Sequence, residues 1–427
     1  MHANSYYAAT ARDTKGFAQL AENTDVDVAI IGGGFSGVAT AVELAERGKK
    51  VVLLEANKVG WGATGRNGGQ VTGSLSGDKA MAREFRRSVG SEADDVVWKT
   101  RWRGHDIIRN RIEKYGIECD LSFGHLQTAM KASHLDELKA IYDEALKRGM
   151  GDDLELVDGE SIPNYLETDI YCGGLLNRRN MHVHSMDLCV GEARAAESLG
   201  AMVYENSQVL KIEHGSGRPV LITEHGRVVA DRVLIAGNAY HHLEQKELKG
   251  KMFPASLANM ATVELGEEVA RQINPHNLAV YDCRFVLDYY RCTADHRLMF
   301  GGGTNYSGRD SQDIGAELRP ALERTFPRLK GIDIEFSWAG IDGIVLNRIP
   351  QVGKIGENVF YMQGYSGHGI ALTHILGEIM ADAICGDLTE YLIYENVHHT
   401  KLPFTRTLGS QAIAVGMMYY KLKEKLR

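Results

Sequence analysis

VDVAIIGGGFSG, residues 26–37, joins an apolar run rich in β-branched side chains to a turn rich in glycine. Val26–Ile31 is typical of a buried strand in a parallel sheet. Val38–Arg47 follows with the apolar spacing of a helix, and Val51–Leu54 is a second apolar run that ends at Glu55. The order strand, turn, helix, strand within about thirty residues predicts a β-α-β unit.

The turn has the spacing G-x-G-x-x-G at Gly32, Gly34 and Gly37. Gly32 permits a tight turn, Gly34 lets the backbone approach a pyrophosphate, and Gly37 lets the helix lie close to the strand. The N–H groups at the start of the helix then face the phosphates. Glu55 follows Gly37 by eighteen residues, where a carboxylate accepts hydrogen bonds from ribose hydroxyls. Because a strand precedes it and a helix follows it, the motif predicts a dinucleotide site.

Two more glycine-rich segments follow, GWGATGRNGGQ at 60–70 and QGYSGHG at 363–369. The first combines Arg66, side-chain amides and a hydroxyl with many backbone N–H groups, which suits a long polyoxygenated ligand. The second stands between an expected strand and an expected helix, and such a helix start stabilises negative charge on the N1–C2=O edge of a reduced flavin. His368 is open to two interpretations, a structural histidine or a catalytic acid or base. FAD is long enough to reach all three segments.

Composition narrows the class of protein. The chain has 427 residues, which suggests two domains, and its 44% apolar and 24% charged residues are ordinary for a globular protein. A net charge of −8 without a Lys/Arg stripe argues against nucleic-acid binding. The first 25 residues lack the apolar core of a signal peptide, so we expect a cytoplasmic protein. No Cys/His spacing predicts a metal site, and six reduced thiols are expected: Cys119, Cys172, Cys189, Cys283, Cys292 and Cys385.

Strand–helix units at both ends of the chain enclose β-rich stretches in the middle. The predicted fold is α/β, a Rossmann-type FAD-binding domain with an inserted antiparallel β-sheet substrate domain of α+β type. The C-terminal tail has an apolar part and a basic end, which either packs on the protein or lies on a membrane surface. The predicted boundaries are an N-terminal extension at 1–24, an FAD-binding domain at 25–100, 155–248 and 339–400, a substrate domain at 101–154 and 249–338, and the tail at 401–427.

The chain resembles the D-amino-acid oxidase family of flavoproteins, which includes glycine oxidase, sarcosine oxidases and many amine oxidases. Asp25–Gln70, the Val209 region, Ala236–Asn238 and Trp338–Asp382 carry the resemblance. It implies an FAD-dependent oxidoreductase with an FAD site lined by Gly32, Gly34, Phe35, Ser36, Gly37, Glu55, Ala56, Gly62, Ala63, Thr64, Arg66, Asn67, Gly68, Gly69, Gln70, Val209, Gly237, Gly340, Gly367, His368, Gly369 and Ile370. The candidate substrate-side residues are His368, Tyr365, Trp338, Asp342, Tyr289, Asn238 and Tyr240.

Three positions depart from these relatives. Sarcosine oxidases attach FAD through a cysteine downstream of the Trp338 region, where this chain has none, so noncovalent FAD is expected. Glycine oxidases have an arginine at the position of Asp342 that pairs with the substrate carboxylate, and sarcosine oxidases have a lysine at the position of Ala371. A carboxylate beside the reacting amine then lacks its usual partner unless Arg291 or Arg348 supplies one. The resemblance thus implies an amine whose carboxylate is distant or absent, such as gamma-glutamylputrescine or a related polyamine derivative.

The expected reaction transfers a hydride from the carbon next to the amine to flavin N5, and water hydrolyses the resulting imine to an aldehyde and ammonia or an amine. O2 or a respiratory quinone is the expected electron acceptor. Two alternatives stay open: oxidation of a secondary or cyclic amino acid such as pipecolate, iminodiacetate or sarcosine, and a flavin-binding subunit without catalysis. An NAD-dependent dehydrogenase is disfavoured because it leaves segments 60–70 and 363–369 without a ligand.

Overall fold

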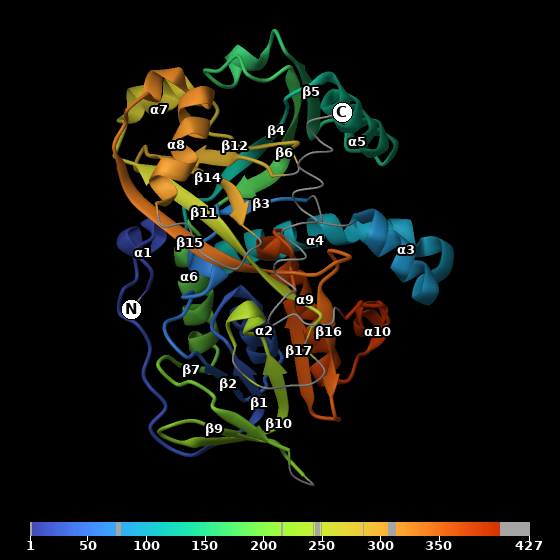
Figure 1. Cartoon of the computed structure of the whole chain (residues 1–427). Helices are drawn as coiled ribbons and strands as arrows, with labels where there is room; N and C mark the ends of the chain where they lie inside the picture. The colour runs from blue at the N-terminus through green and yellow to red at the C-terminus, as the bar shows by residue number, and fades with distance from the viewer. Residues whose placement is uncertain are drawn as a thin grey trace.

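The computed structural model describes residues 2–73, 78–214, 217–241, 243, 248, 250–284, 286–305 and 313–401. In this part of the chain the strands form two β-sheets, one largely parallel and one largely antiparallel (Figure 1). The predicted α/β fold with a second, antiparallel sheet is therefore confirmed. The tail at 402–427, which the sequence places either on the protein or on a membrane surface, lies outside the described residues.

The first sheet has the strand order β16-β17-β10-β1-β2-β7, with β9 beside β10 and β8 beside β9. β1 pairs in parallel with β2 and with β10, and β10 pairs in parallel with β17, so their carboxyl ends lie at one edge of the sheet. Its strands are β1 (Thr24–Ile31), β2 (Val51–Leu54), β7 (Met202–Tyr204), β8 (Lys211–Glu213), β9 (Val220–Ile222), β10 (Arg227–Ile235), β16 (Gln351–Ile355) and β17 (Val359–Gln363).

The second sheet has the order β15-β11-β14-β13-β12-β4-β6-β3, with β5 beside β6. Its strands pair antiparallel, except that β4 pairs in parallel with β12. In Figure 1 this sheet lies in the upper half of the molecule and the first sheet in the lower half. Its strands are β3 (Gln70–Val71), β4 (Ser122–Ala129), β5 (Leu154–Asp158), β6 (Gly173–His182), β11 (Phe253–Thr262), β12 (Ala279–Asp282), β13 (Tyr289–Cys292), β14 (Leu298–Asn305) and β15 (Ile334–Ile344).

The helices are α1 (Tyr6–Thr10), α2 (Phe35–Glu46), α3 (Asp78–Val89), α4 (Ala93–Tyr115), α5 (Ala132–Lys147), α6 (Ser185–Ser198), α7 (Glu267–Ile273), α8 (Ile314–Thr325), α9 (Gly369–Cys385) and α10 (Thr389–Glu395). α2 packs against α6 and α9, α4 packs against α9, and α8 lies on β11, β14 and β15. Within the described ranges, no single helix is long and apolar enough to cross a membrane. The helix pair α9 and α10 has that length and composition, but it is bent by 115°.

Both faces of the first sheet are covered, which explains the uninterrupted apolar run that precedes the glycine turn. Val28 and Ile30 belong to the core formed with α2, α6 and α9, whereas Ala29 belongs to the core on the opposite face. A Cβ atom added to Gly377 of α9 would lie 3.0 Å from Cβ of Ala39 in α2. The two helices therefore cross at a distance that a larger side chain would increase.

Most elements near the glycine turn lie where the sequence predicts them, and the differences fall in the second sheet. The hairpin expected at 285–290 and 297–300 is present as β13 and β14, but β13 begins only at Tyr289. β6, β11 and β15 were not predicted: glycines and polar residues interrupt β6, β11 has no regular alternation, and only the first half of β15 alternates. The domain boundaries stay a prediction, although they place 155–248 with FAD whereas β6 pairs with β4 of the second sheet.

A buried ionic cluster joins the helices on the first sheet. Arg111 of α4 donates to Glu192 of α6 at 3.0 Å and to Glu43 of α2 at 2.7 Å. Nε2 of His374 in α9 lies 3.0 Å from the same Glu192 carboxylate. Burial raises the pKa of Glu192, but His374 and Arg111 together outweigh it and lower this pKa to about 2. Glu192 is therefore ionised at neutral pH and links α4, α6 and α9.

Replacing this carboxylate by an amide tests how much the cluster contributes to stability. We expect Glu192→Gln to lower the free energy of unfolding by about 3–5 kcal/mol, because Arg111 would keep a buried charge with less compensation. Urea unfolding followed by circular dichroism measures the change. The matched control is Glu197→Gln on the same helix, a half-exposed carboxylate paired with Arg194, with an expected change within about 0.5 kcal/mol. An equal loss of unfolding free energy in both variants would show that the buried cluster contributes no more to stability than the half-exposed pair.

Candidate functional site

The glycine turn brings the start of α2 against the end of β1. Gly32 has φ +112°, a conformation that side chains rarely adopt, and a Cβ atom on Gly37 would lie 1.9 Å from the carbonyl oxygen of Gly32. α2 has no side-chain cap at Gly34 and no acidic residue in its first turn. Its first N–H groups lack helical partners by geometry, so this end of the helix suits an anionic group such as a pyrophosphate.

Glu55 lies at the carboxyl end of β2 beside this turn. Its carboxylate accepts hydrogen bonds from the backbone N–H of Gly33 at 2.6 Å and of Asn57 at 2.8 Å. Burial raises the pKa of Glu55, and these two N–H groups oppose the rise. The predicted ribose-binding carboxylate thus stands next to the predicted pyrophosphate-binding turn, with Ala56 exposed directly after it.

The segment 60–70 is held against α2 and α6 by its own side chains. Thr64 Oγ1 accepts a hydrogen bond from the N–H of Phe35 at 3.1 Å. Asn67 donates to the carbonyls of Ala63 and Thr64, and its oxygen accepts from the N–H of Gly69 and the hydroxyl of Ser185. The side chain of Asn67 therefore shapes the loop, and its partners are all protein groups.

Two other predicted cofactor residues in this loop also bond mainly to protein. Arg66 donates to the carbonyls of Trp61 and Ala339, and its guanidinium lies 4.6 Å from the centre of the Trp61 ring. Gln70 donates to Val280 and Tyr290 of the second sheet. The loop is thereby fixed to both halves of the molecule.

Arg291 anchors the same loop from β13. Its Nε donates to the carbonyl of Gly68 at 2.9 Å, and its Nη2 donates to the carbonyl of Val183 and to the hydroxyl of Tyr7. Nη1 donates to the carbonyl of Cys292. Each nitrogen of this buried guanidinium therefore has a protein partner, which argues against Arg291 as the clamp for a substrate carboxylate.

The segment 363–369 connects β17 to α9 and lies beside the start of α2. The hydroxyls of Ser36 and Tyr365 are 2.6 Å apart, and Asn238 accepts a hydrogen bond from the N–H of Gly364 at 2.9 Å. α9 has no side-chain cap and no acidic residue in its first turn, and Gly367 is exposed just before it. This second uncapped helix start also suits a negative charge.

The aromatic candidates line the border between the segment 60–70 and the second sheet. Trp338 and Asn259 both donate to the carbonyl of Arg66, each at 3.0 Å, and Tyr289 donates to the oxygen of Asn259 at 3.0 Å. Tyr240 accepts a hydrogen bond from the backbone N–H of Ile341 at 2.7 Å. Sequence reasoning missed Asn259, which is fully buried on β11 and carries no local motif that could have identified it.

Asp342 and His368 lie at the point where β15 meets the segment 363–369. Asp342 is 9% exposed, and its Oδ2 is 4.0 Å from the position of a Cβ atom on Gly367. Burial raises the pKa of Asp342 to about 7, against the opposing charge of Arg348 and the N–H groups of Gly343 and Gly367. Burial lowers the pKa of His368 to about 4, so this imidazole is neutral at pH 7.

The remaining predicted FAD-site residues occupy positions around these segments. Val209 and Ile370 are buried, and Gly62 and Gly237 are partly exposed. A Cβ atom on Gly340 would lie 2.8 Å from Cβ of Arg66, so the backbone of β15 at Gly340 packs directly against the side chain of Arg66. No observation tests which of the predicted residues contact a cofactor, and these assignments stay predictions.

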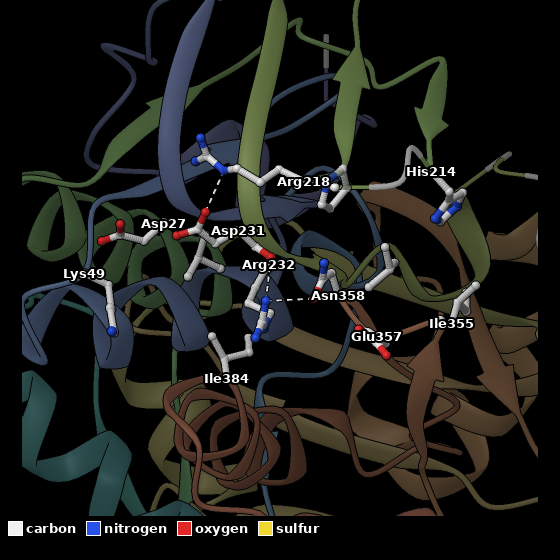
Figure 2. A pocket seen from close by; sticks show the side chains of 15 residues that line it. Asp27, Lys49, His214, Arg218, Asp231, Arg232, Ile355, Glu357, Asn358 and Ile384 are labelled. Atoms are coloured by element: carbon white, nitrogen blue, oxygen red, sulfur yellow. Dashed lines mark hydrogen bonds and ion pairs between the residues drawn. The ribbon is translucent and has the colours of Figure 1, made fainter.

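A polar depression of about 840 Å³ lies elsewhere, near the amino-terminal ends of β10 and β17 (Figure 2). Arg218 pairs with Asp231 at 2.6 Å, and Arg232 donates to Asn358 at 2.7 Å. The glycine motifs follow the carboxyl ends of the strands, where ligands of open α/β sheets bind. None of the predicted site residues lines this depression, so it is not the candidate active site.

The residues present fit FAD on the geometry alone. Two uncapped helix starts, α2 and α9, are tied together through Ser36 and Tyr365, and a carboxylate stands beside the first of them. One helix start suits a pyrophosphate and the other suits the electron-rich edge of a flavin.

A comparison with known families agrees with this fit. A sequence profile described as DAO, FAD dependent oxidoreductase, matches residues 27–383. The chain belongs to this family. The protein is accordingly an FAD-dependent oxidoreductase with FAD as its cofactor, as the sequence predicts.

Individual relatives of this oxidoreductase cover nearly the whole chain. It is 39% identical over 426 residues to the gamma-glutamylputrescine oxidoreductase of Escherichia coli (strain K12), with 100% of this chain and 99% of the relative aligned. It is 25% identical over 381 residues to glycine oxidase of Bacillus licheniformis, with 84% and 93% aligned. The crystal structure of glycine oxidase from Geobacillus kaustophilus has a TM-score of 0.70 at 22% identity, covering 86% of this chain and 98% of that one, which shows a shared fold.

The close contact between the start of α2 and the end of β1 at Gly37 predicts that a larger residue there weakens FAD binding. We expect Gly37→Ala to reduce FAD affinity at least about 100-fold, because the added methyl group would push the helix start away from the pyrophosphate. FAD released by heating the purified oxidoreductase and measured by fluorescence gives the occupancy. Gly217→Ala is the control, since no atom lies within 4 Å of its added Cβ. Full occupancy in Gly37→Ala would contradict the assignment of the turn.

Proposed function

We propose that the protein oxidises a C–N bond of an amine and that its substrate is gamma-glutamylputrescine or a related polyamine derivative. The observation that carries the proposal is the 39% identity, over the full length of both chains, to the gamma-glutamylputrescine oxidoreductase of Escherichia coli. We also propose that FAD is held noncovalently, because no cysteine stands between Cys292 and Cys385.

The charges of the site support an amine whose carboxylate is distant. Asp342 brings a carboxyl group to the segment 363–369, where it attracts an ammonium group and repels a carboxylate. Arg291 has its nitrogens bonded to Gly68, Val183, Cys292 and Tyr7, so it does not offset this preference. An α-amino acid would place its own carboxylate close to Asp342, which is unfavourable at low dielectric.

In the proposed reaction, bound FAD supplies the oxidising chemistry by accepting a hydride from the carbon next to the amine. The start of α9 stabilises negative charge beside the segment 363–369. Asn259 and Trp338 hold the carbonyl of Arg66 and thereby fix the segment 60–70. His368, neutral at pH 7, adds no positive charge that would repel a cationic substrate.

Anaerobic reduction of the bound flavin tests the proposal without any electron acceptor. We expect gamma-glutamylputrescine or a free polyamine to bleach the absorbance at about 450 nm within seconds, and glycine, sarcosine and pipecolate to react at least about 100-fold more slowly. Stopped-flow absorbance gives the rates. Fast bleaching by pipecolate or glycine would favour the amino-acid alternative, and no bleaching by any amine would favour a flavin-binding subunit.

A further inference from the structure

Asp342 has a carboxyl oxygen that the protein leaves without a partner. Its side chain is 9% exposed, and Oδ2 has no hydrogen-bond partner among the residues that the structure describes. Asp342 lies on β15 opposite Ala255 of β11, so the strand pairing fixes its backbone. A buried carboxylate oxygen without a partner is costly, and a polar group from outside the chain would remove that cost.

The charged and titratable groups around Asp342 come from four segments. Arg348, six residues further along the chain, acts on Asp342 through its charge without forming an ion pair. The charge of Asp342 contributes to raising the pKa of Tyr289 of β13, after the larger effect of burial. Tyr240 lies at the neighbouring N–H of Ile341, and His368 follows Gly367 in the segment before α9. None of these groups occupies Oδ2.

The same carboxyl group stands between the two halves of the site. On one side, Gly367 and His368 begin the helix start that suits a flavin edge. On the other side, Tyr289 belongs to the second sheet, which carries the aromatic candidates. Asp342 therefore lies near residues of both halves of the site.

We propose that Asp342 binds the ammonium form of the substrate and accepts one of its N–H protons, so that the amine is neutral before its neighbouring C–H bond is oxidised. This inference rests on the proposed amine oxidation. In the step, one N–H bond breaks and one O–H bond forms at Oδ2, and the electron pair stays on nitrogen. Ammonium and carboxylate become amine and carboxylic acid, so charge and atoms balance and no oxidant takes part.

The chemistry of the pair makes this proton transfer accessible. An alkylammonium group has a pKa of about 10.4 in water, so the substrate arrives protonated. Burial lowers the pKa of an ammonium group and raises that of a carboxyl group, which brings the two values together. The pKa of Asp342, raised to about 7 by burial, places it within reach of this exchange at neutral pH. His368, with a pKa lowered to about 4, is a poorer acceptor.

Asp342→Asn tests the proposal in the FAD-loaded enzyme. We expect kcat/KM for the amine to fall about 10²–10⁴-fold. In the wild type, kcat/KM rises with pH through about 7 as Asp342 ionises, and this ionisation disappears from the Asn variant. Asp342→Glu restores part of the activity and the ionisation. Asp333→Asn is the matched control, an exposed carboxylate just before β15 whose loss leaves kcat/KM and the pH profile unchanged.

Folding of the variant is checked separately. A carboxyl group whose pKa is raised in the folded state makes the protein less stable as the pH rises from the unfolded pKa of about 3.9 through the folded pKa. Asp342→Asn should therefore unfold at the same temperature as the wild type or a higher one at pH 8, with full FAD occupancy. A loss of activity then reports the missing carboxylate and not a damaged fold.

Binding of an ammonium ion that cannot be oxidised separates this inference from the proposed function. tert-Butylamine has no C–H bond next to nitrogen, and trimethylacetate is the anion of the same shape. We expect tert-butylamine to perturb the flavin absorbance of the wild type, and its affinity to fall at least about 10-fold in Asp342→Asn. Trimethylacetate should bind neither the wild type nor the variant.

The outcomes distinguish the two proposals. Amine turnover with an unchanged pH profile in Asp342→Asn would overturn the role of Asp342 and leave the proposed function intact. If no amine bleaches the wild type but tert-butylamine still binds through Asp342, the amine-oxidising function fails and the ammonium site stands. Tighter binding of trimethylacetate than of tert-butylamine would overturn the ammonium site itself.

Discussion

The contact between the end of β1 and the start of α2 leaves no room for a methyl group at Gly37, and the remaining parts of the site depend on it. Thr64 reaches the N–H of Phe35 only because α2 begins at the sheet edge. Ser36, one residue further, meets Tyr365 and so ties the start of α2 to the segment before α9. Two helices that begin more than three hundred residues apart in the chain thereby present their uncapped ends to one region.

The second sheet is coupled to this region through backbone carbonyls. Asn259 and Trp338 share the carbonyl of Arg66, and Arg291 holds that of Gly68. These bonds use side chains of β11, β15 and β13 to position a loop that has little regular structure of its own. Buried carbonyl groups need hydrogen-bond donors, and the side chains of Asn259, Trp338 and Arg291 supply them for Arg66 and Gly68. The segment 60–70 and the second sheet are therefore parts of one hydrogen-bonded unit.

Local patterns predicted the strand and the helix starts of the candidate cofactor site, and long-range contacts determined how its side chains are held. The strand before Gly32 and the uncapped starts of α2 and α9 are visible in short runs of sequence, because periodicity and glycine spacing are local properties. Asn259 could not be predicted, since its partner Arg66 lies 193 residues away and β11 has no alternation to announce it. Asn67 stays a predicted cofactor residue, and in the structure its amide bonds to Ala63, Thr64 and Gly69, which no local pattern announced. Residue type indicates what a side chain can bond to, and only the fold decides which partner it meets.

Two buried polar atoms without a hydrogen-bond partner lie at the candidate site. Oδ2 of Asp342 and Nδ1 of His368 are buried without a hydrogen bond in the described residues, and the start of α9 beside them is uncapped. Other buried atoms among the described residues also lack a partner, such as Nε of Arg284 and Nδ1 of His105, whereas Glu192 and Arg111 are paired in the ionic cluster under the helices. Each unpaired buried polar group lowers stability unless a ligand pairs with it. Under the proposed function, a reduced flavin would bring negative charge to the start of α9, and an ammonium substrate would bring a cation to the carboxyl group of Asp342.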